Sequence, residues 1–152
     1  NDARWTPEEV EELILSTPRD PVVVLVDDEG RQGEGWGEQI LRHLSGSKRV
    51  KVIGVLAVAS NMDQGSPVHV DVSVTASAQV VENAVDKKGT PSPGSSSLQG
   101  DTVENIEELR PPIVVGLGDP GKMDWADDAR IGAPITTKAL QIALGKLATT
   151  SL

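Results

Sequence analysis

The sequence contains no cysteine, no phenylalanine and no tyrosine, and only three tryptophans. Without cysteine the chain has no disulfide, no thiolate nucleophile and no cysteine-ligated zinc. Because large aromatic side chains are so few, the core must be built from valine, leucine, isoleucine and alanine. Aliphatic runs of this kind favour a parallel sheet that is covered by helices on both faces. The 152 residues are enough for a single domain, 1–152.

Basic residues and long apolar runs are also scarce. Lysine and arginine number 14 against 23 acidic residues, so the formal net charge is −9. This balance argues against nucleic-acid binding, which needs a basic surface, and against direct docking on anionic lipid heads. No apolar run approaches the roughly 20 residues of a membrane-spanning helix, and the first nine residues lack signal-peptide character. Direct membrane insertion is therefore not expected, and any membrane role would be peripheral, through a partner.

The first half of the chain has the pattern of a strand–helix–strand unit. A capping sequence at Thr6, Pro7 and Glu9 predicts a helix that ends near Ser16. Residues 22–26, the aliphatic segment, form an unbroken apolar run that predicts a central, buried strand. A second helix is expected over 35–44 and a second buried strand over 50–59. This order favours a right-handed parallel crossover.

The second half combines a hairpin with a third buried strand. Residues 68–74 alternate apolar and polar side chains, which predicts a half-exposed strand, with 79–85 as its hairpin partner. Further along, the sequence predicts a Pro/Gly/Ser-rich flexible surface loop over 89–100 and a short helix over 101–110. A buried strand over 113–117 and a final amphipathic helix over 134–148 follow. The expected fold class is α/β: a three-layer, mostly parallel sheet flanked by helices, with a β-hairpin insertion, toprim-like or doubly wound.

Acidic and glycine residues are densest in the loop that follows the aliphatic segment. In open parallel sheets, ligands bind beyond the carboxyl ends of the strands, where this loop, residues 60–63 and Asp119 would meet. Its crowded carboxylates would suit Mg²⁺ or Ca²⁺, they could cap the following helix, or they could contact a protein. The candidate binding residues are Asp27, Asp28, Glu29, Gly30, Gly33, Glu34 and Gly35, with Asp27, Asp28 and Glu29 as candidate metal ligands; no bound cofactor is required.

A second candidate site lies after the third buried strand. Residues 116–122 match the G-x-x-x-x-G-K spacing of a phosphate-binding loop, and Asp119 and Lys122 are its candidate binding residues. The match fails at Met123, where a hydroxyl should hold Mg²⁺, and Pro120 lacks a backbone donor. A tight turn between strand and helix is the better interpretation. Binding of Mg²⁺ with phosphate or a nucleotide through the 27–34 carboxylates is the alternative function.

The histidines and tryptophans give weaker signals. His43 lies on a predicted helix and His69 at a strand start, and neither has a nucleophile pattern nearby. The sequence therefore predicts no catalytic residue and no enzyme. Trp36 is expected to pack, whereas Trp5 and Trp125 lie in polar stretches and are candidate anchors for a partner.

Six sequence blocks, taken in order, resemble the soluble branch of the stage V sporulation protein AE family. They read DPVVVLVDDEGRQGEGWGEQIL, VIGVLAVAS, HVDVSV, VDKKG, GDTV and IVVGLGDPGKMDWADDARIGAPIT, and the resemblance covers residues 6–144. No single block is diagnostic, but the ordered set is fairly specific. Family members begin with a further strand, bearing a T-D-G-D-like motif, and a helix. The resemblance therefore implies that this sequence starts after both.

The family resemblance implies a function that the spacing of residues in the motifs does not give. It places the protein among those of the spore that handle dipicolinic acid with its Ca²⁺, as a hydrophilic, non-enzymatic subunit. The implied partners are the other proteins of this channel set. The implied location is the forespore or spore, peripheral at the inner membrane, with a role in germination. The resemblance carries over no catalytic residue, and the oligomeric state stays open.

A weaker resemblance concerns the acidic loop alone. A buried strand that ends in acids resembles the toprim fold, in which a D-x-D pair binds Mg²⁺. Here the pair would have to be Asp27 and Glu29, because Asp27 and Asp28 are adjacent. With a net charge of −9, DNA cleavage is not expected.

Overall fold

The computed structural model describes residues 4–27, 35–60, 67–100, 106 and 111–145. A four-stranded mixed sheet forms its centre, with the order β1-β6-β3-β4. The strands are β1 (Val55–Val58), β3 (Val72–Val74), β4 (Val80–Val81) and β6 (Val114–Leu117). β1, β6 and β3 run parallel, and β4 is antiparallel to β3. The predicted α/β class with a mostly parallel sheet is confirmed.

Two hydrophobic clusters occupy the two faces of this sheet, because successive residues of a strand point to opposite faces. Val115 and Leu117 of β6 face helix α4 (Pro134–Ala143), whose Ile135, Ala139 and Ile142 are buried against them. Val114 and the small side chains of β1 face the other way. A two-stranded ribbon of β2 (Val68–His69) and β5 (Ser97–Leu98) covers that second face. β6 is the central strand, and all four of its residues are buried.

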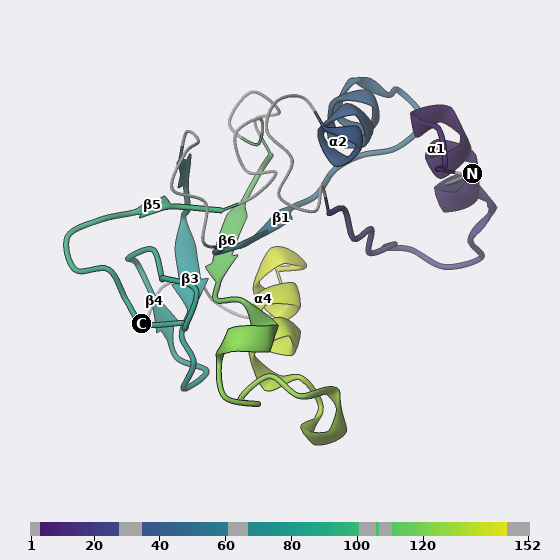
Figure 1. Cartoon of the computed structure of the whole chain (residues 1–152). Helices are drawn as coiled ribbons and strands as arrows, with labels where there is room; N and C mark the ends of the chain where they lie inside the picture. The colour runs from purple at the N-terminus through teal and green to yellow at the C-terminus, as the bar shows by residue number, and fades with distance from the viewer. Residues whose placement is uncertain (1–3, 28–34, 61–66, 101–105, 107–110, 146–152) are drawn as a thin grey trace.

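Helices α1 (Pro7–Ser16) and α2 (Trp36–Gly46) pack against each other beyond the β1 side of the sheet (Figure 1). The predicted cap of α1 is confirmed: the Thr6 hydroxyl accepts from the Glu9 amide at 3.1 Å, and the Glu9 carboxylate accepts from the Thr6 amide at 2.7 Å. α2 begins one residue after Gly35, whose amide donates to the Glu38 carboxylate at 3.0 Å. Ile40 and Leu44 form the buried side of α2.

The aliphatic segment, residues 22–26, corrects the largest sequence prediction. It is extended but is not a strand, and it runs as a coil outside the sheet (Figure 1). Val23 is 68% exposed and Leu25 is 88% exposed. The prediction of a buried central strand is therefore wrong for this arrangement. An apolar run indicates that burial of its side chains is favourable, but it does not specify which strand the run would pair with.

Smaller corrections concern the second half of the chain. The single strand predicted for residues 68–74 is two strands: β2 pairs with β5, and β3, which is fully buried, pairs with β6. The predicted hairpin is confirmed as β3 with β4. The 89–100 segment, predicted to be a surface loop, contains β5, whose Leu98 is fully buried. The strand predicted for 50–59 is shorter, and α4 ends at Ala143. The helix predicted over 101–110 lies outside the described residues except for Ile106.

Candidate functional site

Two of the loops that were predicted to converge do lie at the same end of the sheet. β1 and β6 are parallel neighbours with Val58 aligned to Leu117, so Ser60 and Asp119 both follow at the carboxyl edge. The Ala59 amide donates to the Leu117 carbonyl at 2.9 Å, which continues the pairing by one residue. Asp27 is exposed at the end of the aliphatic segment, which is outside this sheet. Asp28, Glu29, Gly30, Gly33, Glu34 and Asp63 lie outside the described residues.

The loop after β6 forms a closed turn, as the sequence predicted. Asp119 accepts from the Gly121 amide at 2.9 Å and so caps the short 3₁₀ helix η1 (Pro120–Lys122). Lys122 Nζ lies 3.2 Å from Asp119 Oδ2. The lysine is thus paired to the loop's own carboxylate, and a backbone cradle for phosphate is not formed here.

The glycines of this loop are required for packing. A Cβ on Gly116 would lie 2.5 Å from Ser73 Oγ, and a Cβ on Gly118 would lie 2.5 Å from the Gly89 amide nitrogen. The Asp119 amide donates to the Lys87 carbonyl at 2.8 Å across the same contact. Gly118 therefore lets the 86–89 turn approach β6 closely, and Gly116 leaves room for Ser73 of β3 and Leu98 of β5, which explains both glycines without a bound nucleotide.

Polar residues between α1 and α2 form a cluster that the sequence did not reveal. Glu11 is only 7% exposed, and its Oε2 lies 2.5 Å from His43 Nε2. The Ser47 hydroxyl donates to Glu11 Oε1 at 2.8 Å, and Arg49 Nε lies 3.9 Å from the same oxygen. The Ser47 hydrogen bond and then the His43 hydrogen bond lower the pKa of Glu11, against the opposing effect of burial.

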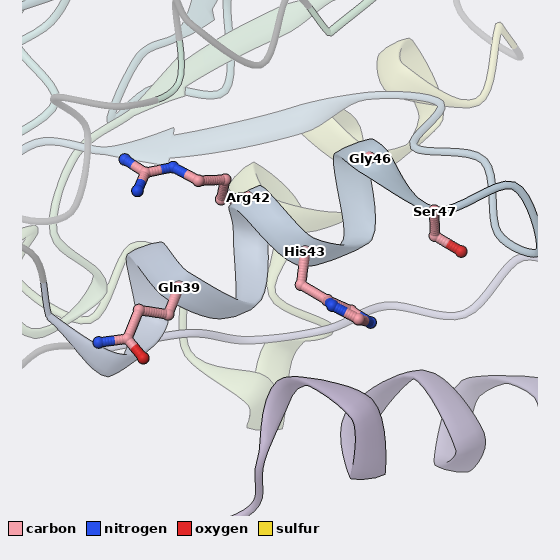
Figure 2. Close-up of a pocket in the computed structure, with 5 residues that line it drawn as sticks. All are labelled: Gln39, Arg42, His43, Gly46 and Ser47. Carbon is pink, nitrogen blue, oxygen red and sulfur yellow. The ribbon is translucent and has the colours of Figure 1, made fainter.

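Two members of this cluster, His43 and Ser47, line the open hollow drawn in Figure 2, where the His43 side chain extends from α2 toward α1. Glu11 accepts from Ser47 and contacts His43 through separate oxygens, so the histidine does not contact the serine hydroxyl. A serine nucleophile activated by histidine requires that contact. The cluster is instead a polar clamp between two helices. Glu11 lies beside the apolar positions of α1, and no sequence pattern distinguishes it from the other glutamates of that helix.

The most exposed aromatic side chain lies in the loop between η1 and α4. Trp125 is 75% exposed, and its φ of 64° is in the left-handed region, which a bulky residue rarely adopts. The Arg130 guanidinium lies 5.6 Å from the centre of its ring. Ile131, next in the chain, is 65% exposed. Trp125, Arg130 and Ile131 therefore form one contact surface, the tryptophan platform.

Asp128 holds the arginine of this platform in place. Its Oδ1 accepts from Arg130 Nε at 3.0 Å, and its Oδ2 accepts from the terminal NH2 group at 2.7 Å. The hydrogen bonds to Arg130 lower the pKa of Asp128, and the same contact raises the pKa of Arg130. Asp128 also caps the 3₁₀ helix η2 (Ala129–Ile131). The prediction that Trp125 is exposed is confirmed, and Trp5, the other candidate anchor, is 54% exposed.

Groups of three or more histidine, aspartate or glutamate side chains that could hold a metal ion do not occur among the described residues. The same residues contain no helix that is long and apolar enough to cross a membrane. The remaining histidine, His69, accepts or donates one hydrogen bond with Ser96 Oγ at 3.0 Å near the surface. The described part of the chain therefore presents contact surfaces and a helix clamp.

The fold and these features define an α/β domain with a mixed sheet and an exposed tryptophan platform. The stage V sporulation protein AE1 family matches residues 1–146, and the chain belongs to this family. The resemblance found in the sequence blocks is thereby confirmed, and the protein has a role in sporulation. Comparisons with curated proteins and with solved structures give no match.

Proposed function

We propose that this protein is a non-enzymatic accessory subunit of the assembly that carries dipicolinic acid, with its Ca²⁺, in the spore. It acts in germination, peripherally at the spore inner membrane, and it is held there by other proteins of the channel set. The observation that carries the proposal is family membership over residues 1–146. The net charge of −9 supports attachment through a protein rather than through anionic lipid.

The tryptophan platform is the part of the described surface best suited to such a contact. Tryptophan and arginine are enriched among the residues that contribute most binding energy at protein interfaces. Trp125 and Arg130 are stacked, and Asp128 fixes the guanidinium, so little side-chain freedom is lost when a partner covers them. Ile131, next to Arg130 in the chain, adds exposed apolar area.

A pull-down from detergent-solubilised spore membranes, with the tagged protein as bait, tests the proposal. Channel proteins of the dipicolinic acid set should be recovered with the unchanged chain, and Trp125→Ala should reduce their recovery by about tenfold or more. Trp5→Ala is the matched control, because it removes an exposed tryptophan outside the platform. Failure to recover any channel subunit with the unchanged protein would refute the proposal. Equal losses for both variants would refute the platform as the contact.

A further inference from the structure

β1 is one of the two edge strands of the central sheet. Val55 and Ala59 donate their amides to Ile113 and Leu117 on the β6 side, both at 2.9 Å. In a parallel ladder alternate residues bond to opposite sides, so the amides and carbonyls of Leu56 and Val58 point away from β6. In the described part of the chain no further strand stands beside β1. Among the described residues, the outward backbone groups of β1 therefore have no strand partner.

The side chains of this edge do nothing to discourage pairing. Natural sheets protect exposed edges with charges, proline or bulges. β1 reads VLAV and contains none of these. Such an edge is available for pairing with a further strand.

The aliphatic segment, residues 22–26, has the sequence character of a strand but pairs with none of the described strands. It is five residues long, a typical strand length, and four of the five are β-branched valines, which favour strands. None of the backbone hydrogen bonds recorded for the described residues involves it. Leaving Val23 and Leu25 in water forgoes burial of about 1.5–3 kcal/mol for each such side chain.

The chain order supplies the connection between this segment and the β1 edge. Parallel neighbours need a crossover of about a dozen residues or more, which usually contains a helix. Helix α2 (Trp36–Gly46) lies between the aliphatic segment and β1. A tethered segment also competes at an effective concentration in the millimolar range, which favours the chain's own strand over one from a second copy.

We propose that the aliphatic segment docks along β1 as a fifth, parallel strand and thereby carries Asp27 to the carboxyl edge of the sheet. Asp27 then lies at the end where Ser60 and Asp119 follow β1 and β6. The docked arrangement restores the convergence of loops that a parallel sheet would give. It rests on backbone pairing and burial alone, so it stands or falls independently of the proposed channel role.

Hydrogen exchange on the full chain is the first test. Docking predicts that the amides of Leu56 and Val58 exchange at least 100-fold more slowly than unprotected amides, together with alternate amides of residues 22–26. Val24→Asp should abolish this protection and leave the β6 amides, which pair on the other side, protected. Exchange of Leu56, Val58 and residues 22–26 at unprotected rates in the unchanged chain overturns the proposal.

A second measurement uses the absence of native cysteine. Cysteine pairs placed at Leu56 and, in turn, at Val23, Val24 and Leu25 should give one register that oxidises within a single chain, because neighbouring strands bring Cα atoms to about 5 Å, inside the disulfide range. The control pairs Val24→Cys with Glu82→Cys, which is exposed beside β4 at the opposite edge. A covalent dimer as the main product shows strand exchange between two copies and overturns docking within the chain. Equal oxidation of the control pair does so too.

Substitution at Leu25 separates docking from general instability. Leu25 is 88% exposed in the arrangement described above, where Leu25→Asp would leave the free energy of unfolding unchanged. Docking predicts that this variant unfolds at a clearly lower urea concentration, whereas Ile131→Asp, at 65% exposure, does not. Equal midpoints for Leu25→Asp and the unchanged chain contradict the docked strand.

Discussion

The sheet with α4 and the α1–α2 pair are stabilised in different ways. In the first region buried aliphatic side chains fill both faces of β6, and α4 adds Ile135, Ala139 and Ile142. In the second region a buried carboxylate, Glu11, links the helices through His43 and Ser47. Apolar packing responds to volume, whereas a carboxylate clamp responds to pH. The comparison teaches that one short chain can contain regions that fail under different conditions.

The largest effect is expected in the apolar region. Ile135→Ala should lower the free energy of unfolding by about 2–5 kcal/mol, because it leaves a cavity at a fully buried position between α4 and the sheet. Urea denaturation followed by tryptophan fluorescence measures the loss. Leu13→Ala on α1, at 45% exposure, is the control and should cost clearly less. Similar losses of unfolding free energy at the two positions would show that the two regions do not differ in this way.

A smaller effect is expected where β6 meets β3. Gly116→Ala should cost about 1–3 kcal/mol, because the added methyl group would lie 2.5 Å from Ser73 Oγ and 2.9 Å from Leu98 Cδ1. Gly46→Ala is the matched control at the end of α2, where a Cβ meets nothing within 4 Å. It should leave stability unchanged or raise it by up to about 1 kcal/mol. Thermal unfolding of both variants measures the two changes in stability. A Gly116→Ala variant as stable as the unchanged chain would show that the β6 packing can relax.

The elements that were correctly predicted are those with local signals. The Thr6, Pro7 and Glu9 pattern specifies the start of α1 within four residues, and the cap hydrogen bonds are present. The β3–β4 hairpin and the buried β6 likewise follow from short patterns. The parallel pairing of β1 with β6 agrees with the mostly parallel sheet that the aliphatic runs predicted.

The elements that were missed depend on contacts between distant residues. β5 lies in a Ser/Pro-rich stretch, and only its pairing with β2, in which Ser97 lies opposite His69, makes it a strand. Glu11 is one of several glutamates on α1, and its role depends on His43 and Ser47 of another helix. Asp119 and Lys122 were candidate binding residues, and their contact with each other also could not be predicted from the sequence pattern alone.

Removal of the α1 cap should have a smaller, local effect. Thr6→Ala should destabilise α1 by about 1 kcal/mol, because the Glu9 amide loses its acceptor. Thr6→Ser keeps the hydroxyl and should keep most of the stability. Hydrogen exchange of the first turn of α1 reports the change, while the β6 amides should not respond. Faster exchange in β6 would mean that the helix pair and the sheet unfold together.

The smallest effect on global unfolding, and the one most specific to the clamp, is expected from Glu11→Gln. Hydrogen bonds from Ser47 and His43 lower the pKa of Glu11 in the folded chain below its ordinary value of 4.5. Its carboxylate therefore contributes stability above that value, and the contribution is lost as the pH falls through the lowered folded pKa. Acid should thus loosen the α1–α2 contact before it affects the β6 core, and Glu11→Gln should remove this step.

Trp36 reports the acid step directly, because its indole nitrogen donates to the Trp5 carbonyl across the same helix pair. Fluorescence in a Trp125→Phe background follows that region without the platform's signal. Glu82→Gln, at an exposed carboxylate beside β4, is the matched control and should leave the acid step in place. If Glu11→Gln titrates like the unchanged chain, the carboxylate clamp does not govern the contact, and the α1–α2 pair must depend on apolar burial of Ile40 and Leu44 as the sheet depends on its core.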